Sequence, residues 1–78
     1  MSKAAIVLGA LNAELRANGT VETSFTVGEA VVMRPMLAKN LDTAEQDFIR
    51  TYGLTAAEAA TFRTRIERDG SASIPAAI

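Results

Sequence analysis

The sequence predicts a small α+β domain with an N-terminal helix, a β-hairpin and two consecutive helices around Gly53. Three observations lead to this prediction. Leucines recur at helical spacing near the start, apolar and polar residues alternate over residues 21–27, and one helix start signal precedes Gly53 while another follows it. An all-α small helical domain is the alternative. The length of 78 residues suits one domain, 1–78, with residues 71–78 as an extended or flexible C-terminal tail.

The first predicted element is a helix over residues 2–18. Leu8, Leu11 and Leu15 form one stripe at spacings of three and four, and alanines form a second face of small residues. A helix that is apolar on two faces lies in the centre of a domain or is shared with another chain. A buried strand over residues 4–8 is the competing prediction, because isoleucine, valine and leucine fit either structure.

The second element is a β-hairpin. Residues 21–27 alternate between polar side chains and β-branched or aromatic ones, which is the period of a strand with one wet face. Gly28-Glu29 fits a two-residue type II′ turn, and residues 30–33 then return as the second strand. The rival interpretation is a short helix within residues 26–34, which also begins with a capping-box pattern.

The first helix of the central pair is predicted to begin at Asp42. Its carboxylate is a good helix cap, and Glu45 lies three residues later, as a capping box requires. Thr43 with Gln46 offers the same start one residue further on. Gly53 is expected to end this helix, because the residue after a helix end often needs a positive φ.

The second helix of the pair is predicted to begin at Thr55, with Glu58 completing a capping box and Gly70 ending the helix. Phe48 of the first helix and Phe62 of the second fall on the faces that point inward. Caps, period and breakers agree over this stretch, so the pair is predicted to form the centre of the fold.

Composition excludes several kinds of chemistry. The chain contains no histidine and no cysteine, so it has no disulfide, no His/Cys zinc site and no catalytic triad of the Ser-His-Asp or Cys-His type. No glycine-rich phosphate loop occurs. We therefore expect no catalytic residues, no cofactor, no metal and no enzymatic activity. The apolar run at residues 4–11 is too short to span a bilayer, so a cytoplasmic chain without a membrane partner is expected.

The expected function is that of a non-enzymatic protein-binding subunit or adaptor that associates with copies of itself or belongs to an assembly. Fifteen alanines give a core with little large apolar surface, and small domains of this kind often gain stability from a partner. The candidate protein-binding residues are Leu8, Leu11, Leu15, Ile74 and Ile78.

The alternative function is a helix-turn-helix DNA-binding regulator, in which the second helix of the pair enters the major groove. Its candidate phosphate contacts are Arg63, Arg65 and Arg68. A net charge of −1 disfavours DNA as a partner, because phosphate contacts by lysine and arginine dominate affinity for nucleic acids.

Overall fold

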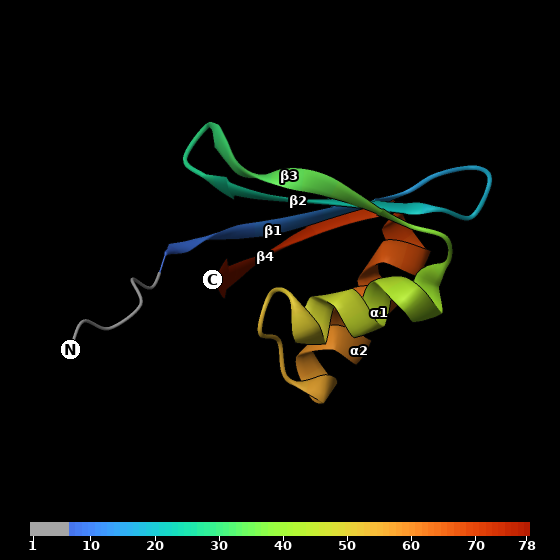
Figure 1. Ribbon diagram of the computed structural model, residues 1–78. Helices are drawn as coiled ribbons and strands as arrows, with labels where there is room; N and C mark the ends of the chain where they lie inside the picture. The colour runs from blue at the N-terminus through green and yellow to red at the C-terminus, as the bar shows by residue number, and fades with distance from the viewer. Residues whose placement is uncertain (1–6) are drawn as a thin grey trace.

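The computed structural model describes residues 7–78, and it contains an antiparallel sheet of four strands with two helices packed on one face (Figure 1). The strand order across the sheet is β3-β2-β1-β4, so the first and last strands of the chain are neighbours. The elements along the chain are β1 (Leu8–Leu15), β2 (Val21–Val27), β3 (Ala30–Ala38), α1 (Leu41–Arg50), α2 (Ala56–Asp69) and β4 (Ser71–Ala77).

The predicted N-terminal helix is wrong, because residues 8–15 form strand β1; residues 2–6 of that prediction lie outside the described residues. The burial of this segment follows a period of two, not the leucine spacing: Leu11 and Ala13 are buried, whereas Leu8 and Glu14 are exposed. β1 pairs with β2 on one side and β4 on the other. These long-range hydrogen bonds override the helix propensity of leucine and alanine.

The predicted fold is therefore corrected to a four-stranded sheet with two helices, and the all-α alternative is also wrong. The segment 26–34 contains no helix. Strands β2 and β3 meet at Gly28-Glu29, where Gly28 has a φ of 61° and Glu29 does not have a positive φ, which is the pattern of a type II′ turn. These two strands do not form a separate hairpin, because β1 continues the sheet beside β2.

Strand β3 does not end at residue 33 as predicted but runs past Pro35 to Ala38. β3 is an edge strand, where a missing amide is tolerated. Its register against β2 shifts twice, between Thr23 and Phe25 and between Phe25 and Thr26, so the strand is bulged. Proline and bulges are the usual means of making a sheet edge unsuitable for further pairing.

Helix α1 begins earlier than Asp42 or Thr43, the two predicted starts. Asn40 is its N-cap, and the Asn40 side-chain oxygen accepts a hydrogen bond from the Thr43 amide at 2.8 Å. Asp42 instead lies in the first turn, where its negative charge favours the helix dipole. The helix ends at Arg50, before Gly53.

Helix α2 confirms the capping box predicted at its start. The Glu58 amide donates to the Thr55 hydroxyl at 3.1 Å, and the Thr55 amide donates to the Glu58 carboxylate at 2.9 Å. Gly70 caps the other end of the helix with a φ of 83°. The chain then turns directly into β4, so the residues expected as an extended or flexible tail form a strand of the sheet.

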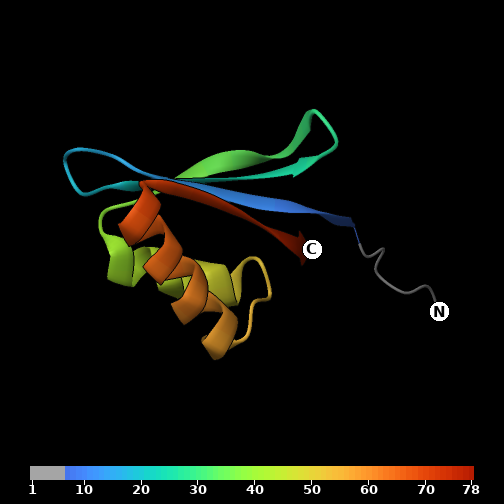
Figure 2. The same ribbon diagram turned by 180° about the vertical axis from the view of Figure 1, so that it is seen from behind.

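The core lies between the sheet and the helices, which cover the same face in both views (Figures 1 and 2). Phe48 of α1 and Phe62 of α2 meet edge to face with ring centroids 5.0 Å apart. Phe25 of β2 stacks near Tyr52, whose hydroxyl lies 3.4 Å from that of Thr23. Since both helices serve as the second layer of a two-layer fold, the prediction of a small helical, helix-turn-helix-like domain is wrong.

Candidate interaction surfaces

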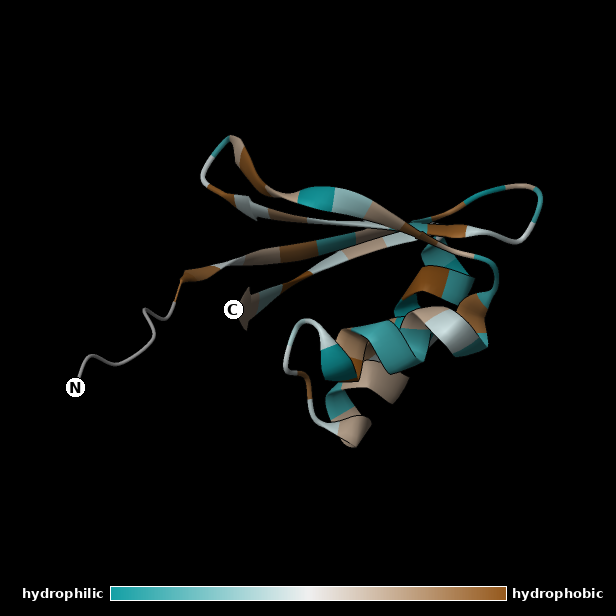
Figure 3. Ribbon diagram, in the orientation of Figure 1, coloured by the Kyte–Doolittle hydropathy of each residue, from teal (hydrophilic) through white to brown (hydrophobic). Residues whose placement is uncertain are grey.

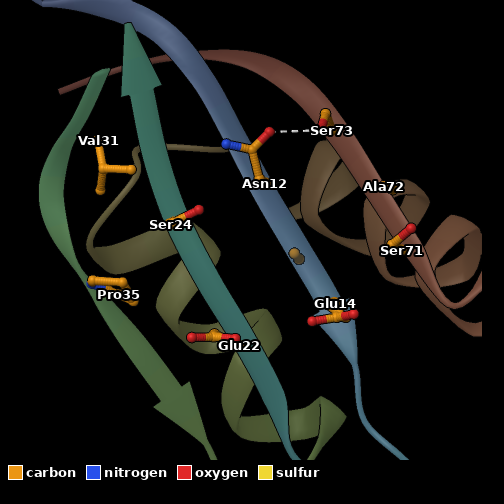
Figure 4. A pocket seen from close by; sticks show the side chains of 10 residues that line it. Asn12, Glu14, Glu22, Ser24, Val31, Pro35, Ser71, Ala72 and Ser73 are labelled. Atoms are coloured by element: carbon orange, nitrogen blue, oxygen red, sulfur yellow. Dashed lines mark hydrogen bonds between the residues drawn. The ribbon is translucent and has the colours of Figure 1, made fainter. Parts of the chain in front are cut away.

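The face of the sheet that the helices leave uncovered is the first candidate surface. A hollow of about 430 Å³ lies on it (Figure 4). The residues that line it come from all four strands: Asn12, Ala13, Glu14, Glu22, Ser24, Val31, Pro35, Ser71, Ala72 and Ser73. Its floor is largely polar because the alternation that sends apolar side chains toward the helices sends their neighbours to this face.

A row of hydrogen-bonded side chains crosses three strands on this face. The Asn12 amide group donates to the Thr26 hydroxyl at 3.0 Å, and the Ser73 hydroxyl donates to the Asn12 side-chain oxygen at 2.6 Å. Asn12 therefore links β2, β1 and β4. This row was not predicted from the sequence, although the polar Asn12 between Leu11 and Ala13 indicates a strand with one wet face.

Two carboxylates lie opposite each other on the same face. Glu14 of β1 pairs in register with Glu22 of β2, and like charges in that position repel. Arg16 relieves part of this repulsion, since its guanidinium donates to the Glu22 carboxylate at 2.5 Å. The hydrogen bond from Arg16 to Glu22 raises the pKa of Arg16.

Exposed large apolar side chains also occur on the strands that carry this polar floor. Leu8, at the start of β1, is 73% exposed, and Val31 and Leu37 of β3 are 59% and 61% exposed. Leu37 lies directly opposite Glu22, which places it on the uncovered face (Figure 3 shows the hydropathy of each segment). The face therefore combines a hydrogen-bonded polar centre with an apolar margin, and we call it the open face.

The second candidate surface is the free edge of β4 with the groove beside it. Helix α2 and Ile74 of β4 enclose a hollow of about 260 Å³. Its lining includes Glu58, Phe62 and Arg65 from successive turns of α2. β4 is the edge strand opposite β3, and its pairing with β1 continues without any register shift from Leu8–Ala77 to Glu14–Ser71.

The structure separates the residues predicted to bind protein. Leu8 is exposed: strand alternation puts its side chain on the same face as Asn12, and the residue also borders a hollow with Tyr52 and Gly53, whereas Leu11 is fully buried in the core. Leu15, Ile74 and Ile78 are partly buried and pack against that core. Of these, Ile74 also lines the groove beside α2, so Leu8 and Ile74 belong to two different surfaces.

The three arginines predicted to contact phosphates lie on α2, and two of them are held by carboxylates. Arg63 donates to Asp42 and, at 3.1 Å, to Glu45, and these hydrogen bonds raise its pKa. Arg68 pairs with the adjacent Asp69, which raises the pKa of Arg68 and lowers that of Asp69. Arg63 therefore ties α2 to α1 and is not directed at an external anion.

Arg65 differs from the other two. It lines the groove beside β4 and makes no ion pair within 4.0 Å among residues 7–78. Within the same part of the chain, no group of three or more acidic side chains gathers in a geometry that holds a metal ion. No helix among the described residues is long and apolar enough to cross a membrane.

No protein-family model, curated protein or solved structure matches this chain.

Proposed function

We propose that this chain is a non-enzymatic protein-binding subunit that belongs to an assembly and associates with copies of itself. The observation that carries this proposal is the open face of the sheet, where Leu8, Val31 and Leu37 stay largely exposed. Exposed apolar residues gathered around a polar patch are typical of surfaces that bind protein.

The polar centre of the open face supports specificity. Asn12 and Ser73 are fixed by hydrogen bonds within the sheet, so they present their remaining donor and acceptor positions in a set geometry. A partner that covers the apolar margin removes these groups from water and must satisfy them. The preferred partner is therefore a protein surface with both apolar side chains and hydrogen-bonding groups.

The proposal places the subunit in the cytoplasm, because a chain without cysteine depends on no disulfide and suits a reducing compartment. Its chemistry is that of binding: the open-face carboxylates, Glu14 and Glu22, lie on an open surface with no histidine or cysteine beside them. The apolar margin and the polar centre can both contact a partner protein, and neither contact requires a chemical reaction.

Capture of partners with matched baits tests the proposal. Immobilised wild-type protein is compared with Leu37→Lys, which puts a charge on the open face, and with Gln46→Lys, which puts the same charge on an exposed position of α1. We expect the wild type and Gln46→Lys to retain the same proteins. Leu37→Lys should bind these proteins with an affinity at least about tenfold lower, because a lysine at an apolar contact must be desolvated.

Retained proteins are identified by mass spectrometry, purified and titrated against each variant by calorimetry. The proposal is overturned if all three baits retain the same proteins with equal affinity, or if the wild type retains none and remains monomeric in light scattering.

A further inference from the structure

The free edge of β4 presents backbone groups at alternate residues. The amide and carbonyl of Ile78 both bond to Val7, and the carbonyl of Gly70 accepts from the Leu15 amide at 2.8 Å. Even-numbered residues of β4 therefore bond to β1, and the odd-numbered residues direct their backbone groups away from the sheet. Along this edge, Ser71, Ser73 and Ala77 offer both a donor and an acceptor.

Pro75 belongs to the odd-numbered set and offers a carbonyl only. The amide that Pro75 lacks would lie on the free side, so Pro75 removes no bond to β1, and the register against β1 continues through it. The edge thus keeps its pairing capacity at Ser71 and Ser73, whereas the loop at Gly53 lies beside the Ala77 end, where a Cβ on Gly53 would be 3.8 Å from the Ala77 carbonyl oxygen. The opposite edge, β3, is bulged twice and is less suited to pairing with another strand.

The groove between this edge and α2 carries charges of opposite sign. Glu58 and Arg65 are seven residues apart, so they lie on one side of the helix and about 10 Å apart along its axis. The small residues Ala57 and Thr61 line the same groove, and Ile74 lies beside them. This face of α2 is therefore acidic at one end and basic at the other, and small side chains lie between the two charges.

A two-fold axis at Ile74 pairs the free edges of the two β4 strands and, at the same time, brings opposite charges of the two α2 helices together. On β4, it sets Ser73 against Pro75 of the partner subunit and Ser71 against Ala77 of the partner subunit, so that the free edges pair antiparallel. On α2, the same axis reverses the helix and sets Glu58 against Arg65 of the partner subunit, and the reverse pair forms by symmetry. Arg65 lowers the pKa of Asp69 in its own chain but makes no ion pair within 4.0 Å among residues 7–78, and this arrangement supplies one.

We propose that two copies of this chain pair through the free edges of β4 around a two-fold axis at Ile74, with the α2 helices side by side on the same face. The result is one continuous antiparallel sheet that leaves both open faces free for other proteins. This inference rests on the self-association included in the proposed function, and it specifies where that association occurs.

Light scattering and sedimentation equilibrium measure the mass of the wild type over a concentration series. We expect a particle of twice the monomer mass of 8.2 kDa. Ser73→Pro removes the Ser73 amide from the free edge and is expected to abolish the dimer, whereas Ser73→Ala keeps this amide and keeps the dimer. Circular dichroism checks that both variants are folded.

A charge exchange tests the α2 contact without relying on a loss of function. Arg65→Glu and Glu58→Lys each create two like-charge contacts in a homodimer, so each is expected to weaken dimerisation at least about tenfold. Glu58→Lys also removes the carboxylate that accepts from the Thr55 amide at the start of α2, so circular dichroism checks that both variants are folded. Mixing the two variants restores an opposite-charge pair on both sides of the axis. The mixture is therefore expected to form a heterodimer more tightly than either variant associates with itself.

The outcomes separate this inference from the proposed function. A wild type that stays monomeric at all concentrations overturns the inference, while partner capture by the open face still tests the proposed function. A dimer that survives Ser73→Pro but is lost with Leu37→Lys forms through the open face; this overturns the inference and leaves the proposed function standing. Failure of the mixed variants to associate overturns the α2 contact.

Discussion

The two faces of the sheet are built from the same strands but differ in what holds them. On the inner face, Leu11, Val21 and Phe25 are fully buried against the helices. On the open face, Asn12 bonds to Thr26 and Ser73 in contact with water. Burial of apolar area stabilises the first face, whereas hydrogen bonds that compete with water stabilise the second, so the inner face should dominate stability.

The largest expected difference compares Phe62→Ala with Leu37→Ala. Phe62 is buried and packs on Phe48, so its loss should lower the free energy of unfolding by about 3–5 kcal/mol. A domain of this size has roughly 4–12 kcal/mol in total, so this variant is partly or wholly unfolded. Leu37 is 61% exposed, and its replacement should cost less than about 0.5 kcal/mol. Urea denaturation at low concentration measures both; equal losses would contradict the division between faces.

The next prediction concerns Gly9, which lies inside β1. A Cβ at this position would lie 2.3 Å from the Thr26 carbonyl oxygen and 2.9 Å from the Phe25 ring. Gly9→Ala should therefore destabilise the protein by about 1–3 kcal/mol through overpacking.

Gly19→Ala is the control for this substitution, because a Cβ at Gly19 has no neighbour within 4 Å. Only the positive φ of Gly19 opposes the change, at a cost of about 1 kcal/mol. The melting temperatures of the two variants compare the cost of a packing clash, in Gly9→Ala, with the cost of backbone strain, in Gly19→Ala. A lower melting temperature for Gly19→Ala than for Gly9→Ala would show that the close approach of β1 and β2 is not tight.

A smaller effect is expected from Asn12→Ala on the open face. This change removes the hydrogen bonds to Thr26 and Ser73 and should cost about 0.5–1.5 kcal/mol. Ser24→Ala is the matched control, because Ser24 lies opposite Asn12 on the same face and its side chain makes no hydrogen bond among the described residues. If the two variants are equally stable in urea, the row of side chains contributes nothing to the sheet.

The smallest predicted effect is a gain in stability. Glu14→Gln removes the repulsion between Glu14 and Glu22 and should stabilise the sheet by about 0.2–1 kcal/mol at low salt. Salt screens the repulsion that this substitution removes, so the difference from the wild type should shrink as ionic strength rises. Urea denaturation at two salt concentrations measures this; a salt-independent gain would have another cause.

How far the sequence predicts the structure differs between the helical half and the strand half. The Thr55–Glu58 capping box and Gly70 act over one helical turn, and they are found where the sequence puts them. Asn40 was missed as the cap of α1 because Asp42 and Thr43 offer equally good capping patterns two and three residues later. Such competition between neighbouring caps is decided by how the helix packs.

For the candidate surfaces, the sequence indicated exposed apolar residues but not which ones share a face. Leu8 and Leu11 belong to one stripe on a helix and to opposite faces of a strand, and only the second arrangement exists. Arg65 could not be distinguished from Arg63, because the carboxylates of Asp42 and Glu45 reach Arg63 only when α1 and α2 pack together.

The sequence by itself determined the features with local causes: the boundary of α2, the turn at Gly28-Glu29, and the absence of histidine and cysteine chemistry. Only the tertiary structure decided that residues 8–15 are a strand, because their partners in β2 and β4 include residues more than 60 positions away. A backbone that can satisfy its hydrogen bonds either within itself or with distant strands takes the arrangement that buries more apolar surface.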